Sequence, residues 1–225
     1  MNALSRGFTV ENKKKVISHG EHPLLSVNLK YPAFTPLSAE PAEKRFTDKV
    51  NRFYEDGARK YLAHAASDCT RRAAKLSKRN GAACSLVMNC EVPYAGEKYI
   101  SVFADISAFD GKDVRTLRLS QLWSAEKGAL LPPSYIFRTG SRETRYVKSI
   151  LCEIAESNAR RKIFTYFDNY KAIINRKFRF SASYLVPNGA AFYFDGGVLS
   201  ASMRDICVFV VPFERIDGLL KIAPG

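Results

Sequence analysis

The chain has 225 residues, of which 46% are hydrophobic and 12% aromatic. This composition can fill the core of one large domain or two small ones, and it excludes a chain that is disordered throughout. The formal net charge is +13, and most of the excess of Lys and Arg falls in residues 1–80 and 141–180, which both contain helical patterns. A balance this basic is compatible with an anionic partner and equally with solvated helix faces.

The sequence contains neither a membrane-spanning pattern nor a secretion signal. No apolar run approaches the roughly 18 residues that cross a bilayer, and Lys13, Lys14 and Lys15 are not followed by the apolar block of a signal peptide. We therefore expect the chain as written to be cytoplasmic, and an extracytoplasmic location would require an upstream segment. The five cysteines are scattered, without a Cys-x-x-Cys pair, which favours reduced, mostly buried thiols over a disulfide framework.

The first third of the chain is predicted to contain an arm, a strand and a long helix. Residues 1–20 are polar and are expected to form an irregular N-terminal arm. Apolar and polar residues alternate from Leu25 to Tyr31, which predicts a strand with one buried face. Apolar residues then recur at steps near 3.6 from about Pro41 to Asn80, which predicts a long helix that ends at Asn80-Gly81.

Strand patterns dominate the middle of the chain. Alternation over 84–92 and 100–108 predicts two strands, which the turn at 93–96 joins as a hairpin. Residues 114–119 are expected to form a third strand, and residues 120–123 the start of a short helix.

The last third is predicted to hold a second long helix and three strands. The helical pattern runs from about Ser141 to Asn175. Two apolar runs then flank Pro187-Asn188-Gly189, and an Asn-Gly pair in this position is typical of a tight hairpin turn. We expect Asn188 and Gly189 at the tip, with Gly189 at positive φ. Residues 206–211 form the final apolar run.

This order of elements, β–α–ββ(β)–α–βββ, predicts an α+β fold in which an antiparallel sheet packs against two long helices. The arm at 1–20 precedes one domain, residues 21–225. The alternative division is into two subdomains, 21–119 and 120–225.

Few residues have the spacing of a catalytic or metal site. His19, Glu21 and His22 lack the spacing of a known metal motif and lie in a predicted loop. The segment from Asp110 to Asp113 has the composition of a turn. We therefore expect no cofactor, no metal and no enzymatic activity. The alternative, an enzyme acting on cell-wall or other anionic substrates, would need Asp105 or Asp195 to converge with His64.

A basic run is the strongest candidate for a binding surface. Residues 69–79 contain no acid, and Arg71, Lys75 and Arg79 would share one face of a helix with Arg72 beside it. Such a stripe can bind phosphates or another anionic polymer, and residues 160–162 and 176–179 could extend it. Nucleic acid is one partner of this class, although the chain has no recognised nucleic-acid-binding motif. The alternative is a solvated helix face that serves solubility.

Several segments occur in the order found in one bacterial family. They are the strand from Leu25 followed by a long helix, the Leu117–Trp123 segment, the Leu185–Phe194 hairpin, and the closing strand Cys207–Phe213 with its Pro and aromatic residue. In this order the chain resembles, from residue 22 onward, a family of unknown function typified by the extracytoplasmic domain of the anti-sigma factor RsiV. It departs from that family at Tyr94–Glu97, where the family often has a Gly-His-Gly-like turn.

The resemblance implies a non-enzymatic sensor or binding module with an unidentified protein or anionic ligand. RsiV itself binds lysozyme, and no contact residues of the family map onto this chain. Lysozyme is a poor candidate here, because it is itself basic and like charges repel on approach.

Overall fold

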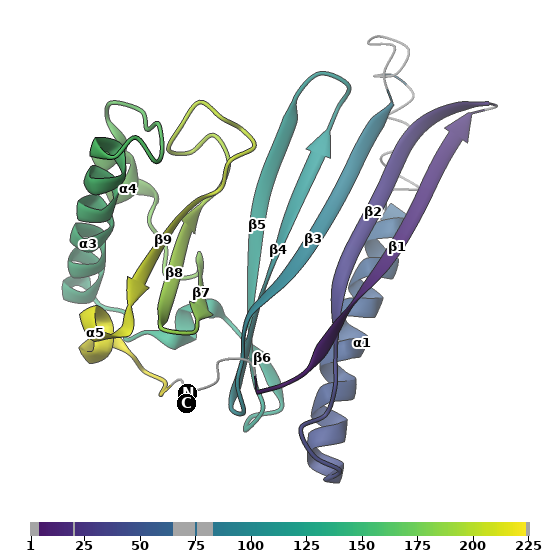
Figure 1. The fold of residues 1–225 in the computed structure, drawn as a ribbon, viewed down its shortest axis with the longest axis horizontal. Helices are drawn as coiled ribbons and strands as arrows, with labels where there is room; N and C mark the ends of the chain where they lie inside the picture. Colours follow the sequence, from purple (N-terminus) through teal and green to yellow (C-terminus); the bar gives the residue numbers. More distant parts are fainter. Residues whose placement is uncertain (1–4, 20, 65–74, 76–82, 224–225) are drawn as a thin grey trace. The chain divides into compact units, whose positions relative to one another are not determined.

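In the computed structural model of the protein, residues 5–19, 21–64, 75 and 83–223 are described (Figure 1). The chain forms two compact units. The N-terminal unit comprises residues 6–91 and 104–117, and the C-terminal unit comprises residues 1–5, 92–103 and 118–225. This division differs from a single boundary between residues 119 and 120, because the chain passes between the units four times along its length. None of the helices among the described residues is long and apolar enough to span a membrane.

The fold class is α+β, as the sequence predicted. One sheet has six strands in the order β1 to β6: β1 (Phe8–His19), β2 (His22–Phe34), β3 (Cys84–Ala95), β4 (Tyr99–Phe109), β5 (Val114–Ser124) and β6 (Ala129–Leu131). The second sheet has three strands, β7 (Ser183–Val186), β8 (Gly189–Phe194) and β9 (Cys207–Pro212). The larger sheet is mixed, since β2 and β3 run parallel. The helix α1 (Pro41–His64) lies between them in the chain, and a crossover of this kind permits parallel pairing.

The expectation of an irregular arm at residues 1–20 is wrong for residues 8–19, which form the edge strand β1. The strand pairs antiparallel with β2 along its whole length. Its apolar residues Val10 and Val16 are 55% and 63% exposed, so it has no buried face that would produce a strand pattern in the sequence. Pairing with β2 satisfies its backbone groups instead, and lysines are common on such edges.

The N-terminal unit forms its core where α1 packs on β2. Leu25, Val27 and Leu29 are buried on one face of the strand, as their alternation predicted. The buried residues of α1 follow the helical period and are Phe46, Thr47, Val50, Tyr54 and Ala58. The predicted end of this helix at Asn80 lies outside the described residues.

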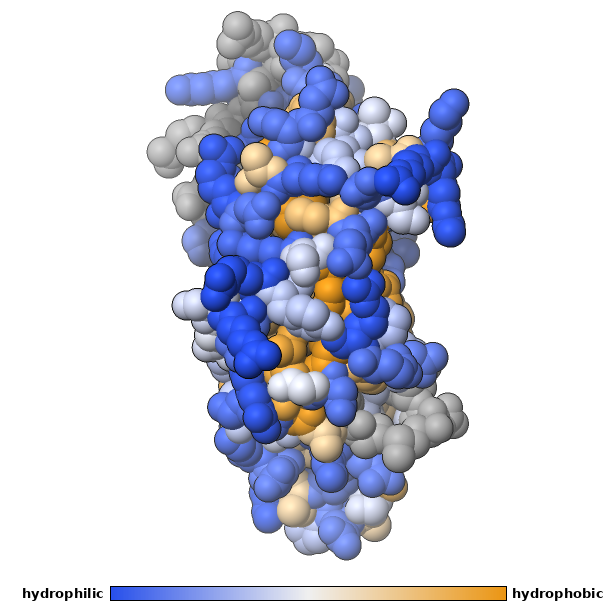
Figure 2. Space-filling view, turned by 90° about the vertical axis from the view of Figure 1, so that its left-hand side faces the viewer, coloured by the Kyte–Doolittle hydropathy of each residue, from blue (hydrophilic) through white to orange (hydrophobic). Residues whose placement is uncertain are grey.

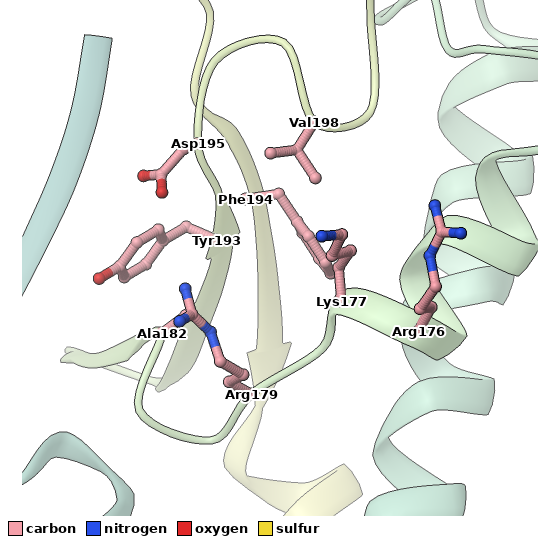
Figure 3. A pocket seen from close by; sticks show the side chains of 8 residues that line it. All are labelled: Arg176, Lys177, Arg179, Ala182, Tyr193, Phe194, Asp195 and Val198. Atoms are coloured by element: carbon pink, nitrogen blue, oxygen red, sulfur yellow. The ribbon is translucent and has the colours of Figure 1, made fainter.

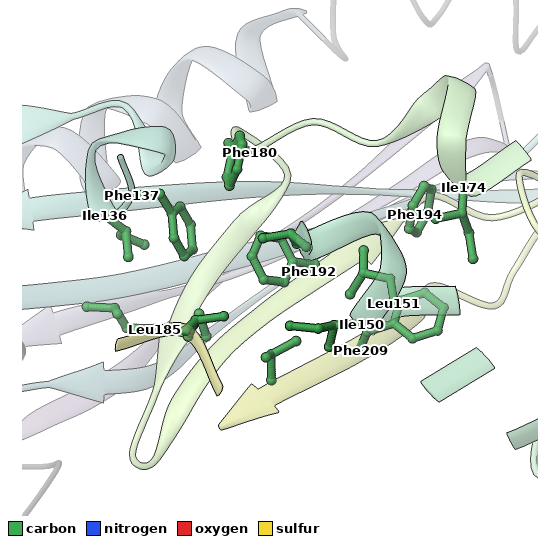
Figure 4. Packing of buried hydrophobic residues seen from close by; sticks show 14 of the residues in the cluster. Ile136, Phe137, Ile150, Leu151, Ile174, Phe180, Leu185, Phe192, Phe194 and Phe209 are labelled. Atoms are coloured by element: carbon green, nitrogen blue, oxygen red, sulfur yellow. The ribbon is translucent and has the colours of Figure 1, made fainter. Parts of the chain in front are cut away.

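In the C-terminal unit, the three-stranded sheet packs on α3 (Ser141–Arg160) and α4 (Tyr170–Lys177). Phe192 stacks on Phe137 with 5.1 Å between ring centroids, and Leu185, Ile150 and Leu151 are at most 1% exposed (Figure 4). The face of the C-terminal unit that lies on the left in Figure 1 is mostly hydrophilic, with a strip of apolar side chains between the polar ones (Figure 2). Three short helices complete the unit: η2 (Pro133–Ile136), α5 (Phe213–Ile216) and η3 (Asp217–Leu219).

The predicted helix from Ser141 to Asn175 is broken into α3 and α4. Lys162 adopts a left-handed conformation with φ of 57°, and the Ile163 N–H donates to the Asn158 carbonyl at 2.9 Å. This is the hydrogen-bond pattern of a helix C-terminus that glycine usually provides, and the use of Lys hid it from the sequence pattern. Residues 120–123, predicted to begin a short helix, instead continue β5.

The predicted hairpin is present, with a different tip. Val186 pairs with Gly189, so the two-residue loop is Pro187-Asn188. Gly189 is absent from the residues at positive φ. Glycine is required at position 189 for a different reason: a Cβ there would overlap the carbonyl of Val211 on β9. The closing strand β9 matches the predicted final run.

A buried ion pair ties the start of the N-terminal unit to α1. Arg6 is 1% exposed, pairs with Glu43 and donates to the Thr47 hydroxyl at 3.1 Å. Its guanidinium, together with the Leu37 N–H and the Thr47 hydroxyl, holds the pKa of Glu43 below its ordinary value of 4.5. A depressed carboxyl pKa adds stability above pH 4.5 that is lost as the pH falls through the folded-state pKa.

We expect Glu43→Gln to lower the free energy of unfolding at pH 7 by about 3 kcal/mol, because it leaves Arg6 buried without its counter-charge. Urea titrations of the variant and the wild type at pH 7 and at about pH 3.5 measure this difference. It should shrink at the lower pH, because the stability that ionised Glu43 contributes begins to be lost below pH 4.5. The exposed Glu40→Gln is the control, and a Glu43 effect independent of pH would contradict the assignment.

Candidate binding pocket beside Tyr193

Most of the basic stripe predicted from the sequence cannot be placed. Arg71, Arg72 and Arg79 lie outside the described residues, and Lys75 is helical and exposed. The segments suggested as extensions separate in the structure. Arg160 at the end of α3 forms an ion pair with Glu156, whereas Arg176, Lys177 and Arg179 line a pocket.

The pocket depends on the alternation of side chains along β8. Phe192 and Phe194 face the core that contains α3, and Ala191 and Tyr193 belong to a second cluster on the other face of the strand. Period two in a strand requires this separation. It places Tyr193 beside residues of β4, β5 and β7.

Arg118 occupies the centre of that second cluster. Its guanidinium carbon lies 3.8 Å from the ring centroid of Phe103, 5.5 Å from that of Tyr184 and 5.8 Å from that of Tyr193. The guanidinium also donates to the Tyr184 hydroxyl at 2.9 Å. We call these four residues the Arg118 box. Aromatic faces attract a cation electrostatically, and the attraction strengthens where water is excluded, as it is around this 9%-exposed side chain.

Two residues of β5, Arg118 and Ser120, form polar contacts with residues at the end of β8. The Arg118 N–H donates to Oδ1 of Asp195 at 2.9 Å. The hydroxyl of Ser120 lies 3.2 Å from the Tyr193 hydroxyl. Strand β5 therefore holds both Tyr193 and Asp195 by polar contacts as well as by packing.

Tyr193 is a neutral phenol at physiological pH. Burial raises its pKa above the ordinary value of 10, and Asp195 acts in the same direction. The hydrogen bond with Ser120 and the charges of Arg118 and Arg179 oppose this rise without cancelling it. Tyr193 is thus suited to hydrogen bonding with a ligand and unsuited to act as a base.

The resulting cavity, the Tyr193 pocket, has a volume of about 390 Å³. Its lining residues are Arg176, Lys177, Arg179, Ala182, Tyr193, Phe194, Asp195 and Val198 (Figure 3). Arg176 and Lys177 lie in the last turn of α4, where the helix dipole stabilises positive charge. Arg179 follows that helix in the chain.

The three cations of the pocket are exposed, and none of them is paired with a carboxylate in the part of the chain that the structure describes. Within residues 5–19, 21–64, 75 and 83–223, no carboxylate lies within ion-pair distance of Arg176, Lys177 or Arg179. This arrangement contrasts with nearby Lys171 in α4, which pairs with Glu156 at 2.8 Å. The pocket therefore has positive charge available for a ligand.

The loop that follows β8 has a defined fold. Gly197 lies at φ of 80°, and its N–H donates to the Ser202 carbonyl at 2.7 Å. The Val198 N–H donates to the Asp195 carbonyl at 3.1 Å. A Cβ at Gly197 would overlap the sulfur of Met203 and would also be strained by the positive φ. Val198 is thereby held against the pocket.

Among the described residues that line the pocket there is no acid–base pair. They include one carboxylate, Asp195, and neither His nor Cys. The enzymatic alternative needed Asp105 or Asp195 to converge with His64; His64 and Asp105 belong to the N-terminal unit, and neither lines this pocket. In the part of the chain that the structure describes, no three His, Cys, Asp or Glu side chains gather in a way that could hold a metal ion.

Two other groups of residues weighed as candidate chemistry have structural roles. Oδ1 of Asp110 accepts the N–H groups of Lys112 and Asp113 at 3.0 Å, so this segment is a turn, as predicted. Burial raises the pKa of Cys90 to about 12 and that of Cys207 to about 11, which makes both thiols poor nucleophiles.

The sequence carried one misleading signal at this site. Leu117 and Leu119 are 39% and 43% exposed, and Arg118 between them is buried. The usual inside-outside pattern of a strand is therefore reversed. In the sequence, the Arg118 box is indicated only by an Arg between two leucines in a predicted strand. This pattern does not identify the aromatic residues of β4, β7 and β8 that surround the guanidinium.

Comparisons with known proteins give a fold and no activity. No family model and no curated protein matches the chain. Among solved structures, a member of the DUF3298 family from Bacteroides fragilis has a TM-score of 0.66 at 12% identity, covering 100% of this chain and 97% of that one. A DUF3298 family protein from Pseudomonas aeruginosa has a TM-score of 0.60 at 14% identity, covering 96% of this chain and 94% of the other. The chain thus has the fold of these DUF3298 proteins.

Proposed function

We propose that the protein is a non-enzymatic binding or sensory domain, related to the RsiV-like family, and that its binding centre is the Tyr193 pocket. The order of the Leu185–Phe194 hairpin and the closing strand β9 supports the family assignment. The neighbours of the same fold belong to a family named only as a domain of unknown function.

One observation carries the proposal: three exposed cations, Arg176, Lys177 and Arg179, line one cavity, and none of them forms an ion pair among the described residues. Like charges gathered around a concave site repel one another, and an anionic ligand relieves that repulsion. Arginine suits such a role because its planar guanidinium can hold a carboxylate or phosphate by two parallel hydrogen bonds. The ligand is therefore expected to present an anionic group.

The composition of the pocket favours binding over catalysis. Hydrolytic enzymes use a nucleophile with a base, a pair of carboxylates, or a metal-bound water. The lining offers a neutral phenol and a single carboxylate whose Oδ1 already accepts a backbone N–H. An enzyme acting on an anionic substrate stays the alternative, and turnover of such a substrate by the purified protein would establish it.

We expect N-acetyl-Ala-Phe, a small anion with an apolar body, to bind in this pocket. Arg179→Gln should weaken this binding by roughly tenfold, since a hydrogen bond to a charged group is lost. A titration followed by ligand-observed NMR at low salt measures the affinity. Arg204→Gln is the matched control, because Arg204 is exposed on the loop after β8 and does not line the pocket.

The uncharged amide of the same peptide tests the electrostatic basis of this interaction. The wild type should bind the amide more weakly than the anion. Arg179→Gln should bind the amide and the anion equally. If the wild type does not bind the anion, or if Arg179→Gln binds it as tightly as the wild type, the pocket is not an anion-binding centre.

A second proposal concerns an anionic polymer bound along Arg71, Arg72, Lys75 and Arg79. Its support is the acid-free sequence of residues 69–79 and the exposure of Lys75. Polymer affinity should fall with about one power of salt concentration for each neutralised phosphate. Filter binding of single-stranded DNA at two salt concentrations measures this slope, and binding that is unchanged when all four residues are Ala would exclude the stripe.

A further inference from the structure

The Tyr193 pocket contains a carboxylate as well as cations. Asp195 is partly buried at its edge, and Oδ1 of this residue accepts the Arg118 N–H at 2.9 Å. Asp195 forms no ion pair with Arg176, Lys177 or Arg179. Its second oxygen therefore remains an acceptor for a ligand.

Two of the three cations of the pocket, Arg176 and Lys177, lie apart from the carboxylate of Asp195 (Figure 3). Figure 3 shows Asp195 and Tyr193 on one side of the cavity, Arg176 and Lys177 on the opposite side, and Arg179 below Tyr193. A simple anion would be attracted to the cations and repelled by the carboxylate. A ligand with an ammonium group at one end and a carboxylate at the other complements both sides.

The remaining wall is apolar. Ala182, Phe194 and Val198 also line the cavity. Burying an apolar group against them adds binding energy in proportion to the area removed from water. A volume of about 390 Å³ is in the range of pockets that take small molecules.

We propose that the Tyr193 pocket binds a zwitterion with an apolar body, of which a short peptide with free amino and carboxyl ends is the simplest example. This inference rests on the proposed function, since it assigns the ligand class of the same site. Arg179 with Lys177 holds the carboxylate, Asp195 holds the ammonium group, and the apolar wall contacts the side chains.

The experiment compares three peptides that differ by one end charge at a time: Ala-Phe, N-acetyl-Ala-Phe and Ala-Phe amide. Wild-type protein should bind Ala-Phe roughly five- to tenfold more tightly than either derivative, because each lacks one charge-assisted hydrogen bond. Ligand-observed NMR titrations at one salt concentration give the three affinities.

Two variants assign the ends of the peptide. Asp195→Asn retains an oxygen that can accept the Arg118 N–H, so the variant should keep its fold. It should no longer bind Ala-Phe more tightly than N-acetyl-Ala-Phe. Arg179→Gln should lose the preference of Ala-Phe over the amide. Asp205→Asn and Arg204→Gln, exposed and outside the lining, should retain both preferences.

The outcomes separate this inference from the proposed function. If the wild type binds Ala-Phe and N-acetyl-Ala-Phe equally, or if Asp195→Asn leaves their ratio unchanged, the zwitterion assignment is wrong and the anion-binding pocket stands. If neither peptide binds, both proposals fail.

Discussion

Burial of a guanidinium among three aromatic rings determines the architecture around the Tyr193 pocket. Removing a charge from water costs several kcal/mol, which a protein must offset with local contacts. Arg118 meets this cost by lying 3.8 Å from the Phe103 ring and by donating to the Tyr184 hydroxyl. These contacts require β4, β5, β7 and β8 to meet at one point. Asp195 and Tyr193, which contact residues of β5, take their positions from the same constraint.

The Arg118 box and the core of the C-terminal unit lie on opposite faces of one strand, β8. Phe192 and Phe194 pack toward α3, and the stability of the unit depends on them. Ala191 and Tyr193 face the Arg118 box, where polar groups replace part of the apolar packing. At the end of β8 the two faces meet at the pocket, which both Tyr193 and Phe194 line. Binding residues supported by a rigid scaffold are also better oriented than residues on a free loop.

Local signals predicted much of the fold. The strand at Leu25–Leu29, the starts of both long helices and the hairpin around Pro187-Asn188 follow from period and turn chemistry alone. Features that depend on partners were missed. Strand β1 has no buried face and exists through its pairing with β2, and Lys162 ends α3 where a glycine would have been recognised.

The candidate site was less accessible to sequence reasoning than the fold. The sequence predicts residues 176–179 to extend a basic stripe at residues 71–79, most of which lies outside the described residues. In the structure, Arg176, Lys177 and Arg179 line the Tyr193 pocket instead. Arg118 and Tyr193 are 75 positions apart in the chain, and no spacing rule connects them. Only the pairing of β7 with β8, and the packing of Phe103 on Tyr184, brings the box together.

The most direct test of this account compares backbone amide NMR spectra of the wild type and Arg118→Met, a variant that keeps the length of the side chain and removes its charge and donors. We predict displaced or broadened resonances for Tyr193, Asp195 and Val198, and unchanged resonances for Ile150 and Leu151 in the α3 core. Arg118→Lys, which keeps the charge without the planar guanidinium, should show an intermediate effect. A folded Arg118→Met protein whose Tyr193 and Asp195 resonances match those of the wild type would contradict the claim that Arg118 holds the pocket in place.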